Sequence, residues 1–96
     1  MYVDCLHLKK VMSWLNTIDV EHVVLEVSNA CGEDIEILKL TVIGQPGKET
    51  LFEKESIYLA KEHKYQFEIL LEKLYKSLNV ILDLKKEKIK ISLPLR

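Results

Sequence analysis

The chain has 96 residues, 48% of them hydrophobic, with 14 basic and 15 acidic side chains and a formal net charge of −1. This length predicts a single domain, residues 1–96, and the apolar content excludes an intrinsically disordered chain. The near-zero charge excludes a uniformly basic nucleic-acid binder, and two cysteines are too few for a disulfide scaffold.

The first expectation concerns location. No stretch of the sequence is apolar for long enough to span a bilayer, and the N-terminus lacks the basic region of a signal peptide. We therefore expect a cytoplasmic protein with reduced thiols. In this interpretation Cys5 and Cys31 are small buried hydrophobic residues, although the sequence leaves open whether they are paired, free or functional.

Residues 4–18 have the spacing of an amphipathic helix. At about 100° per residue, the apolar side chains fall on one half of the helical wheel and the polar side chains fill the other half. Asp4 is a suitable N-cap for this helix. Only Leu6 breaks the pattern.

Two strands are predicted next, over residues 20–28 and 35–43, joined as an antiparallel hairpin by the turn at 29–34. The second strand is apolar on both faces. One face holds Leu38, Leu40 and Val42, and the other holds Ile35, Ile37 and Ile43. A small domain with one core needs only one apolar face of each strand, so this surplus indicates a partner surface.

A second helix is predicted over residues 56–78, where leucines and Phe67 recur at helical spacing. Residues 49–55 are expected to be a loop or a short strand. The C-terminal part has the alternation of a second hairpin, with strands over 80–84 and 88–93, although the helix could also continue through 84. The predicted fold is α+β, in the order α-β-β-(β)-α-β-β, with two amphipathic helices packed on a mostly antiparallel sheet.

The residues that could carry chemistry form no motif. Cys5, His7, His22 and Cys31 would be enough ligands for a metal, but their spacing matches no metal site. His7 and His63 fall on apolar helix faces, which favours core histidines. A Cys31–His22 pair stays open as a nucleophile and base. We therefore predict no catalytic residue, no metal and no cofactor, and a small hydrolase or metal-dependent nuclease is the least favoured function.

The favoured function is a small non-catalytic interaction or assembly module that forms a homodimer. Tyr58, Tyr65 and Ile69 would form a second apolar stripe on the helix 56–78, opposite its core face. The simplest partner for such a stripe is a second copy of the chain, although another protein could also bind it. No contact with a membrane is predicted.

Nucleic-acid binding is the alternative function. Gly44 and Gly47 frame a G-x-x-G loop, a pattern by which some nucleic-acid-binding domains clamp a phosphate backbone. The last hairpin could add phosphate contacts through Lys85, Lys86, Lys88 and Lys90. The competing interpretation is a plain turn at 44–47 and a lysine-rich edge strand that discourages edge-to-edge pairing.

Overall fold

The computed structural model describes residues 2–16, 18 and 20–95, and it is built from strands. Its seven strands are β1 (Leu6–Leu15), β2 (Glu21–Asn29), β3 (Ile35–Gln45), β4 (Glu49–Leu59), β5 (Lys64–Leu71), β6 (Ser77–Leu84) and β7 (Lys88–Pro94). The one helical element of the described residues is a 3-10 turn at Tyr2–Asp4. The predicted α+β fold is therefore wrong, and the protein is an all-β protein.

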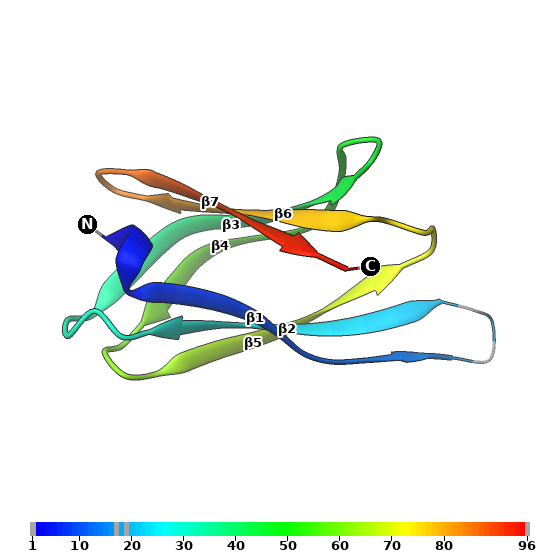
Figure 1. Cartoon of the computed structure of the whole chain (residues 1–96). Coiled ribbons are helices and arrows are strands. Elements are labelled where there is room, and N and C mark those ends of the chain that lie inside the picture. The colour runs from blue at the N-terminus through cyan, green and yellow to red at the C-terminus, as the bar shows by residue number, and fades with distance from the viewer. Residues whose placement is uncertain (1, 17, 19, 96) are drawn as a thin grey trace.

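The strands form two antiparallel sheets that pack face to face (Figure 1). The first sheet has the order β1-β2-β5 and the second has the order β4-β3-β6-β7. Each of β1–β2, β3–β4 and β6–β7 is a hairpin within one sheet, whereas the chain changes sheet after β2, β4 and β5. The result is an elongated sandwich with principal extents of 41 × 23 × 22 Å.

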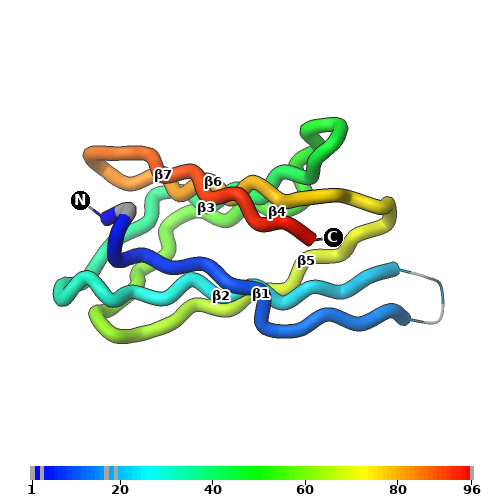
Figure 2. Tube along the Cα trace, in the orientation of Figure 1, coloured from blue at the N-terminus to red at the C-terminus, as the bar shows by residue number. Residues whose placement is uncertain are grey.

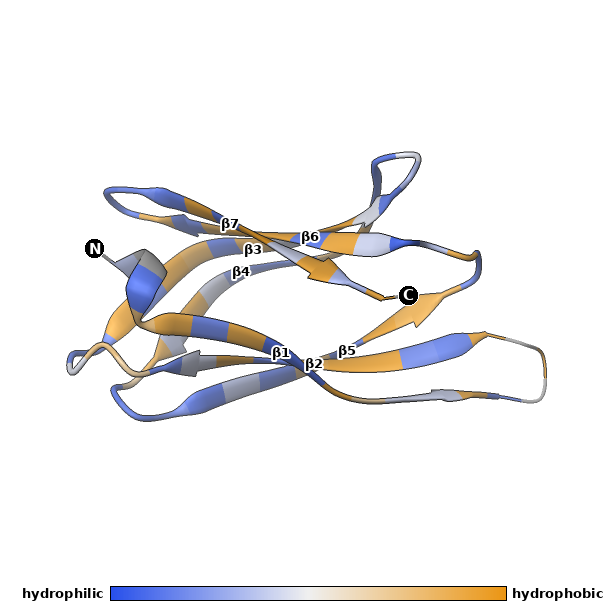
Figure 3. Ribbon diagram, viewed as in Figure 1, coloured by the Kyte–Doolittle hydropathy of each residue, from blue (hydrophilic) through white to orange (hydrophobic). Residues whose placement is uncertain are grey.

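The core lies between the two sheets and follows the two-residue alternation of the strands. Figure 3 shows hydrophobic and hydrophilic bands alternating along several strands. In β6 every second residue from Leu78 to Leu84 is buried, and in β5 every second residue from Phe67 to Leu71 is buried. The largest fully buried apolar side chains are Leu25, Ile37, Leu40, Ile69, Leu71, Leu78 and Leu82.

The predicted helix over residues 56–78 is replaced by the end of β4, a turn and all of β5. The sequence Tyr65, Phe67, Ile69 and Leu71 has the two-residue period of a strand, and all four side chains point toward the core. The turn between the strands contains neither Gly nor Pro, so the usual signal of a chain reversal is absent. Instead, Glu62 takes a left-handed conformation with φ of 62°.

The predicted helix over residues 4–18 is also wrong, because this segment forms β1. The pairing of β1 with β2 shifts register between Lys10 and Met12, where Val11 is an extra residue. A bulge of this kind reverses the alternation, so that even-numbered residues before it and even-numbered residues after it face opposite sides of the sheet. The apolar residues beyond the bulge are exposed, so their helix-like spacing did not mark a buried face.

A second bulge explains the apolar surplus of β3. The pairing of β3 with β6 shifts between Ile37 and Lys39, and Leu38 is the extra residue. Ile35 and Ile37 before the bulge, and Leu40 and Val42 after it, are all buried in the same core. The strand therefore has one apolar face, and it does not supply the partner surface that its sequence indicated.

The strands predicted at 20–28 and 35–43 are present as β2 and β3, but they lie in different sheets and do not form a hairpin. The predicted C-terminal hairpin is confirmed as β6 and β7, which pair from Ser77 and Pro94 to Asp83 and Lys88. Residues 49–55, expected to be a loop or short strand, belong to the long strand β4.

The pairing of the strands resembles that of immunoglobulin-like β-sandwiches. In that class the second and fifth strands pair in one sheet and the third and sixth in the other, as β2–β5 and β3–β6 do here. The fourth strand pairs with β3, whereas constant-type immunoglobulin domains place it in the other sheet. A buried tyrosine before the sixth strand is a further feature of the class, and Tyr75 occupies that position.

Tyr75 packs directly on the backbone of Gly44. A Cβ atom added at Gly44 would lie 2.6 Å from two carbons of the Tyr75 ring, which is too close for any real contact. We predict that Gly44→Ala lowers the free energy of unfolding by about 1–3 kcal/mol, as overpacking does in other cores. Chemical denaturation measures this loss, with Thr50→Ala at an exposed position as the control. Equal stability of the two variants would contradict the packing of Tyr75 on Gly44.

Candidate interaction surface

The three residues predicted to form a dimer stripe do not share a surface. Tyr58 lies on β4 and is exposed, with its hydroxyl donating to Asp34. This hydrogen bond lowers the pKa of Asp34 and raises the pKa of Tyr58. Tyr65 and Ile69 lie on β5 and face the core, and Ile69 is only 2% exposed. The stripe depended on helical geometry, so it is absent from a pair of strands.

The residues predicted to bind nucleic acid are divided between the two ends of the sandwich. Gly44 lies near the end of β3 and Gly47 in the β3–β4 turn, whereas Lys85 and Lys86 lie in the β6–β7 turn. Figure 2 shows these two turns at opposite ends of the molecule. Lys88 and Lys90 are exposed on β7, near the second turn. The two groups therefore do not form one continuous cluster.

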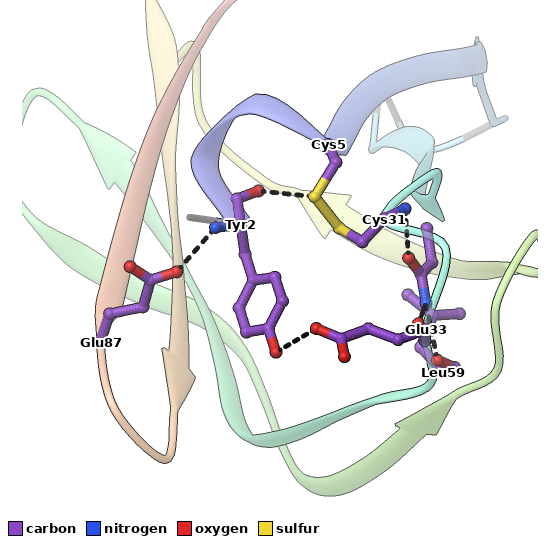
Figure 4. The surroundings of a disulfide bond; sticks show 7 residues. Tyr2, Cys5, Cys31, Glu33, Leu59 and Glu87 are labelled. Atoms are coloured by element: carbon purple, nitrogen blue, oxygen red, sulfur yellow. Dashed lines mark hydrogen bonds between the residues drawn. A yellow bond between two sulfur atoms is a disulfide. The ribbon is translucent and has the colours of Figure 1, made fainter.

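The two cysteines form a disulfide bond between Cys5 and Cys31. It ties the 3-10 turn at the N-terminus to the connection between β2 and β3, as Figure 4 shows. Beside it, Tyr2 donates its backbone N–H to Glu87 over 2.9 Å and its hydroxyl to Glu33 over 2.7 Å. The prediction of reduced thiols is therefore wrong, and the Cys31–His22 pair that the sequence left open is excluded, because both sulfurs are used in a structural cross-link.

The same end of the sandwich carries two shallow pockets. One, of about 370 Å³, is lined by residues 28–30, 32 and 62–64, and the other, of about 250 Å³, by Tyr2, residues 34–36 and residues 84–86. Asn29 forms the polar floor of this region. Its amide donates to the carbonyls of Glu33 and Leu59 and accepts from the N–H of Cys31. These bonds are all internal, so the side chain of Asn29 organises the loops around it.

Two of the histidines are exposed, whereas the predicted helices would have buried them. His7 and His63 are exposed on β1 and in the β4–β5 turn, so neither is a core histidine. The Nδ1–H of His63 donates to the carbonyl of Lys61. Within residues 2–16, 18 and 20–95, no three His, Cys, Asp or Glu side chains are placed to hold one metal ion.

The outer face of the β1-β2-β5 sheet changes from polar to apolar along its length. Near the disulfide the cross-strand row is His7, Ser28 and Lys64, followed by Lys9, Glu26 and Gln66. Beyond the Val11 bulge the rows become Met12, Val24 and Glu68, and then Trp14, His22 and Leu70. The apolar rows lie at the end where the β1–β2 hairpin forms one extremity of the molecule (Figure 1).

We call this apolar region the hairpin patch. It consists of Met12, Trp14 and Leu70 on this outer face, with Val11 and Ile18 beside them, and of Leu15. Leu15 pairs with Glu21 in the row of the buried Leu71, so it lies on the opposite face of the same end of the sheet. The side chains of the patch are between 41% and 76% exposed, and together they are six of the nine large hydrophobic side chains that the described residues expose. The other three, Leu38, Tyr58 and Leu74, belong to β3, β4 and the β5–β6 connection. Concentrated exposed apolar area of this kind marks an interaction surface more strongly than scattered residues do.

A hydrogen-bonded histidine holds the centre of the patch in place. The Trp14 and His22 rings stack with centroids 4.9 Å apart and planes within 8°. Asn16 Oδ1 accepts from the N–H groups of Ile18 and Val20, so its Nδ2 is the group that donates to His22 Nε2 over 3.0 Å. The remaining ring nitrogen, Nδ1, contacts Glu68. Trp14 therefore packs on a ring that is itself held by hydrogen bonds, and it stays 41% exposed.

Glu26 marks the polar border of the patch and gives this face a dependence on pH. Gln66 donates to Glu26 over 2.8 Å, and Lys9 Nζ lies 3.6 Å from its other oxygen. The hydrogen bond from Gln66, with Lys64 and Lys9 nearby, lowers the pKa of Glu26 below its ordinary value. A lowered pKa means that ionised Glu26 stabilises the fold above its unfolded-state pKa and that this stability is lost as the pH falls.

We accordingly predict that acid lowers the stability of the native protein more steeply than that of the Glu26→Gln variant. Between about pH 6 and about pH 3, the free energy of unfolding should fall further in the native protein, because the amide of the variant carries no proton-dependent charge. Denaturation at a series of pH values measures the difference, with Glu36→Gln at an exposed position as the control. An unchanged acid slope in Glu26→Gln would rule out this role.

Comparison of the chain with known proteins gives no match by sequence. No known protein family matches it, and no curated protein matches it significantly. Among the described residues, no helix is long and apolar enough to cross a membrane. Because one sandwich fold carries many unrelated functions, the fold class by itself assigns none, and the surface is what indicates a function.

Proposed function

We propose that this protein is a small non-catalytic interaction module that self-associates through the hairpin patch. The observation that carries the proposal is the concentration of exposed apolar side chains at one end of one sheet. A domain that worked alone would gain solubility by replacing Met12, Trp14 and Leu70 with polar residues, as on the rest of this sheet face. The proposal keeps the homodimer that the sequence favoured and moves its surface from Tyr58, Tyr65 and Ile69 to the hairpin patch.

The anchored tryptophan is the residue that we expect to contribute most. Its ring is already ordered by stacking on His22, so little conformational entropy is lost when a partner covers it. Rigid, partly buried aromatic residues at the centre of a patch are the usual hot spots of protein interfaces. The hydrogen bonds of His22 with Asn16 and Glu68 then form a polar rim on that side of the tryptophan.

The disulfide indicates the kind of compartment in which the module functions. A cytoplasmic location was predicted on the premise of reduced thiols, whereas Cys5 and Cys31 are joined. Disulfides persist in oxidising compartments and are rare in reducing ones. We therefore propose that the module functions in an oxidising compartment, and we do not retain the cytoplasm as its location.

The other two functions have less support. Nucleic-acid binding needed the 44–47 loop and the lysines of the last hairpin to act together, and they lie at opposite ends of the sandwich. A hydrolase or metal-dependent nuclease needed a cluster of catalytic groups, and its best candidate pair lost Cys31 to the disulfide. Neither is carried forward as a proposal.

Sedimentation velocity over a range of concentrations tests the proposal. We predict that the oxidised protein changes from monomer to dimer as its concentration rises. Trp14→Lys should raise the dissociation constant at least about 30-fold, since a hot-spot residue contributes about 2 kcal/mol and 1.4 kcal/mol is a factor of ten. Tyr58→Lys, an exposed aromatic position on the other sheet, is the matched control and should leave the constant unchanged. A monomer at every concentration would refute self-association.

A further inference from the structure

The edges of the two sheets differ in how they are protected against pairing with another strand. The edge strands are β1 and β5 in one sheet and β4 and β7 in the other. β7 carries Lys88, Lys90 and Pro94, and β4 carries the charged run 53–55 followed by Ser56 with φ of 58°. Charges, prolines and irregular backbone are the usual defences of an exposed edge.

Beyond the bulge at Val11, the outer half of β1 has none of these defences. Residues 11–15 read Val-Met-Ser-Trp-Leu, without a charge or a proline, and all five side chains are exposed. The hairpin closes with the N–H of Asn16 donating to the carbonyl of Val20 over 3.1 Å. Since antiparallel pairing alternates inward and outward backbone groups, the N–H and C=O of Ser13 and Leu15 point away from β2, along the sheet edge.

On this basis, and resting on the proposed self-association, we propose that two copies pair antiparallel along residues 11–15 of β1 about a twofold axis at Ser13. The pairing would join two three-stranded sheets into one continuous sheet of six strands. Strand addition at a sheet edge is a common mode of recognition, in which backbone hydrogen bonds hold the partner and side chains select it.

The apolar residues of the segment are placed symmetrically about Ser13. Two antiparallel copies would therefore bring apolar side chains opposite one another, and for this reason we propose a second copy as the partner. Val11 would lie beside Leu15 of the second copy, and Met12 beside its Trp14. Met12 and Trp14 both lie on the outer face of the sheet, so the two hairpin patches would become one apolar surface across the twofold axis. Thioether contact with an aromatic ring is favourable in itself.

The charges beside the segment favour the antiparallel direction. Lys9 and Lys10 lie at one end of it, and parallel pairing would place the two lysine pairs side by side. In the antiparallel arrangement the two Lys10 residues are separated by about 20 Å, from six residues at about 3.3 Å each. That distance exceeds the screening length of about 10 Å, so the repulsion is small. Because each copy uses one such edge, the assembly closes as a dimer.

A cysteine at the twofold position tests the pairing. Ser13 would face Ser13 of the second copy as a hydrogen-bonded pair, with Cα atoms about 5.5 Å apart, which suits a disulfide. We expect Ser13→Cys to form a covalent dimer in high yield under mild oxidation, with Cys5–Cys31 intact. Ser92→Cys, a serine on the edge strand β7, is the matched control and should give no more than background cross-linking.

Amide hydrogen exchange tests the same pairing without a substitution. The Ser13 and Leu15 amides should become at least about tenfold better protected when the protein is concentrated enough to dimerise, whereas the Trp14 amide, which points toward β2, should change little. A dimer that neither cross-links at position 13 nor protects Ser13 and Leu15 would overturn the strand pairing and leave self-association standing. A protein that stays monomeric in sedimentation would overturn both.

Discussion

Removing the disulfide, by replacing both Cys5 and Cys31 with Ala, should lower the free energy of unfolding by about 3 kcal/mol. The bond closes a loop between residues 26 positions apart, so the unfolded chain gains considerable freedom when it is lost. A domain of this size has a total stability of only about 5–15 kcal/mol. The loss is therefore a large fraction of what keeps the fold intact.

Reduction of the native protein provides the matched experiment. A reducing agent should destabilise the native protein by the same amount and leave the Cys5→Ala/Cys31→Ala variant unaffected. Alkylation of the protein taken directly from its natural source should find no free thiol at either position, as expected for an oxidising compartment. Equal stability with and without the bond, or two alkylated thiols, would contradict the structural role of the disulfide.

The second large effect concerns neighbouring leucines on β3. Leu40 is fully buried and pairs across the strands with Leu82, which is also fully buried, whereas Leu38 is the exposed bulge residue. Leu40→Ala should lower the free energy of unfolding by about 3 kcal/mol, because it removes buried methyl groups and leaves a cavity. Leu38→Ala should cost less than about 1 kcal/mol, since its side chain already contacts water.

These two substitutions distinguish the bulged strand of the structure from the regularly alternating strand that the sequence predicted. Regular alternation places Leu38 and Leu40 on the same face, so the two substitutions would then have similar costs. Chemical denaturation of both variants gives the two losses directly. Similar losses for Leu38→Ala and Leu40→Ala would contradict the bulge between Ile37 and Lys39.

Much of the strand content could be predicted from local alternation. Residues 20–28, 35–43 and the last hairpin show clear strand patterns, and all of them are strands. The predictions failed at residues 4–18 and 56–78, where the spacing of the apolar residues is compatible with a helix although the segments form strands. In the second segment the period of two from Tyr65 to Leu71 was visible, but a turn without Gly or Pro concealed the reversal before it.

Bulges account for the remaining errors of the fold. A single extra residue, Val11 in β1 or Leu38 in β3, reverses which face the following side chains take. Such a residue has no reliable sequence signal, because its position is determined by the register with a neighbouring strand. Faces predicted from strict alternation are therefore wrong beyond it.

The candidate interaction surface was harder to predict from the sequence than the fold was. The hairpin patch combines residues of β1 with Leu70, which lies two strands away across the sheet. The predicted helix over residues 4–18 would place Trp14 and Met12 on its apolar, core-facing side, since large apolar residues usually are buried. The one available signal was the uncharged run at residues 11–15, which becomes meaningful only when β1 is known to be an edge strand.

The most direct test of the interaction surface is an NMR measurement on a dimer mixed from isotope-labelled and unlabelled chains. Nuclear Overhauser effects filtered for contacts between chains should connect the Trp14 indole of one copy with the Met12 methyl group of the other. We predict this contact, together with contacts between Val11 and Leu15. A dimer in which Trp14 and Met12 show contacts only within their own chain would contradict the proposed surface.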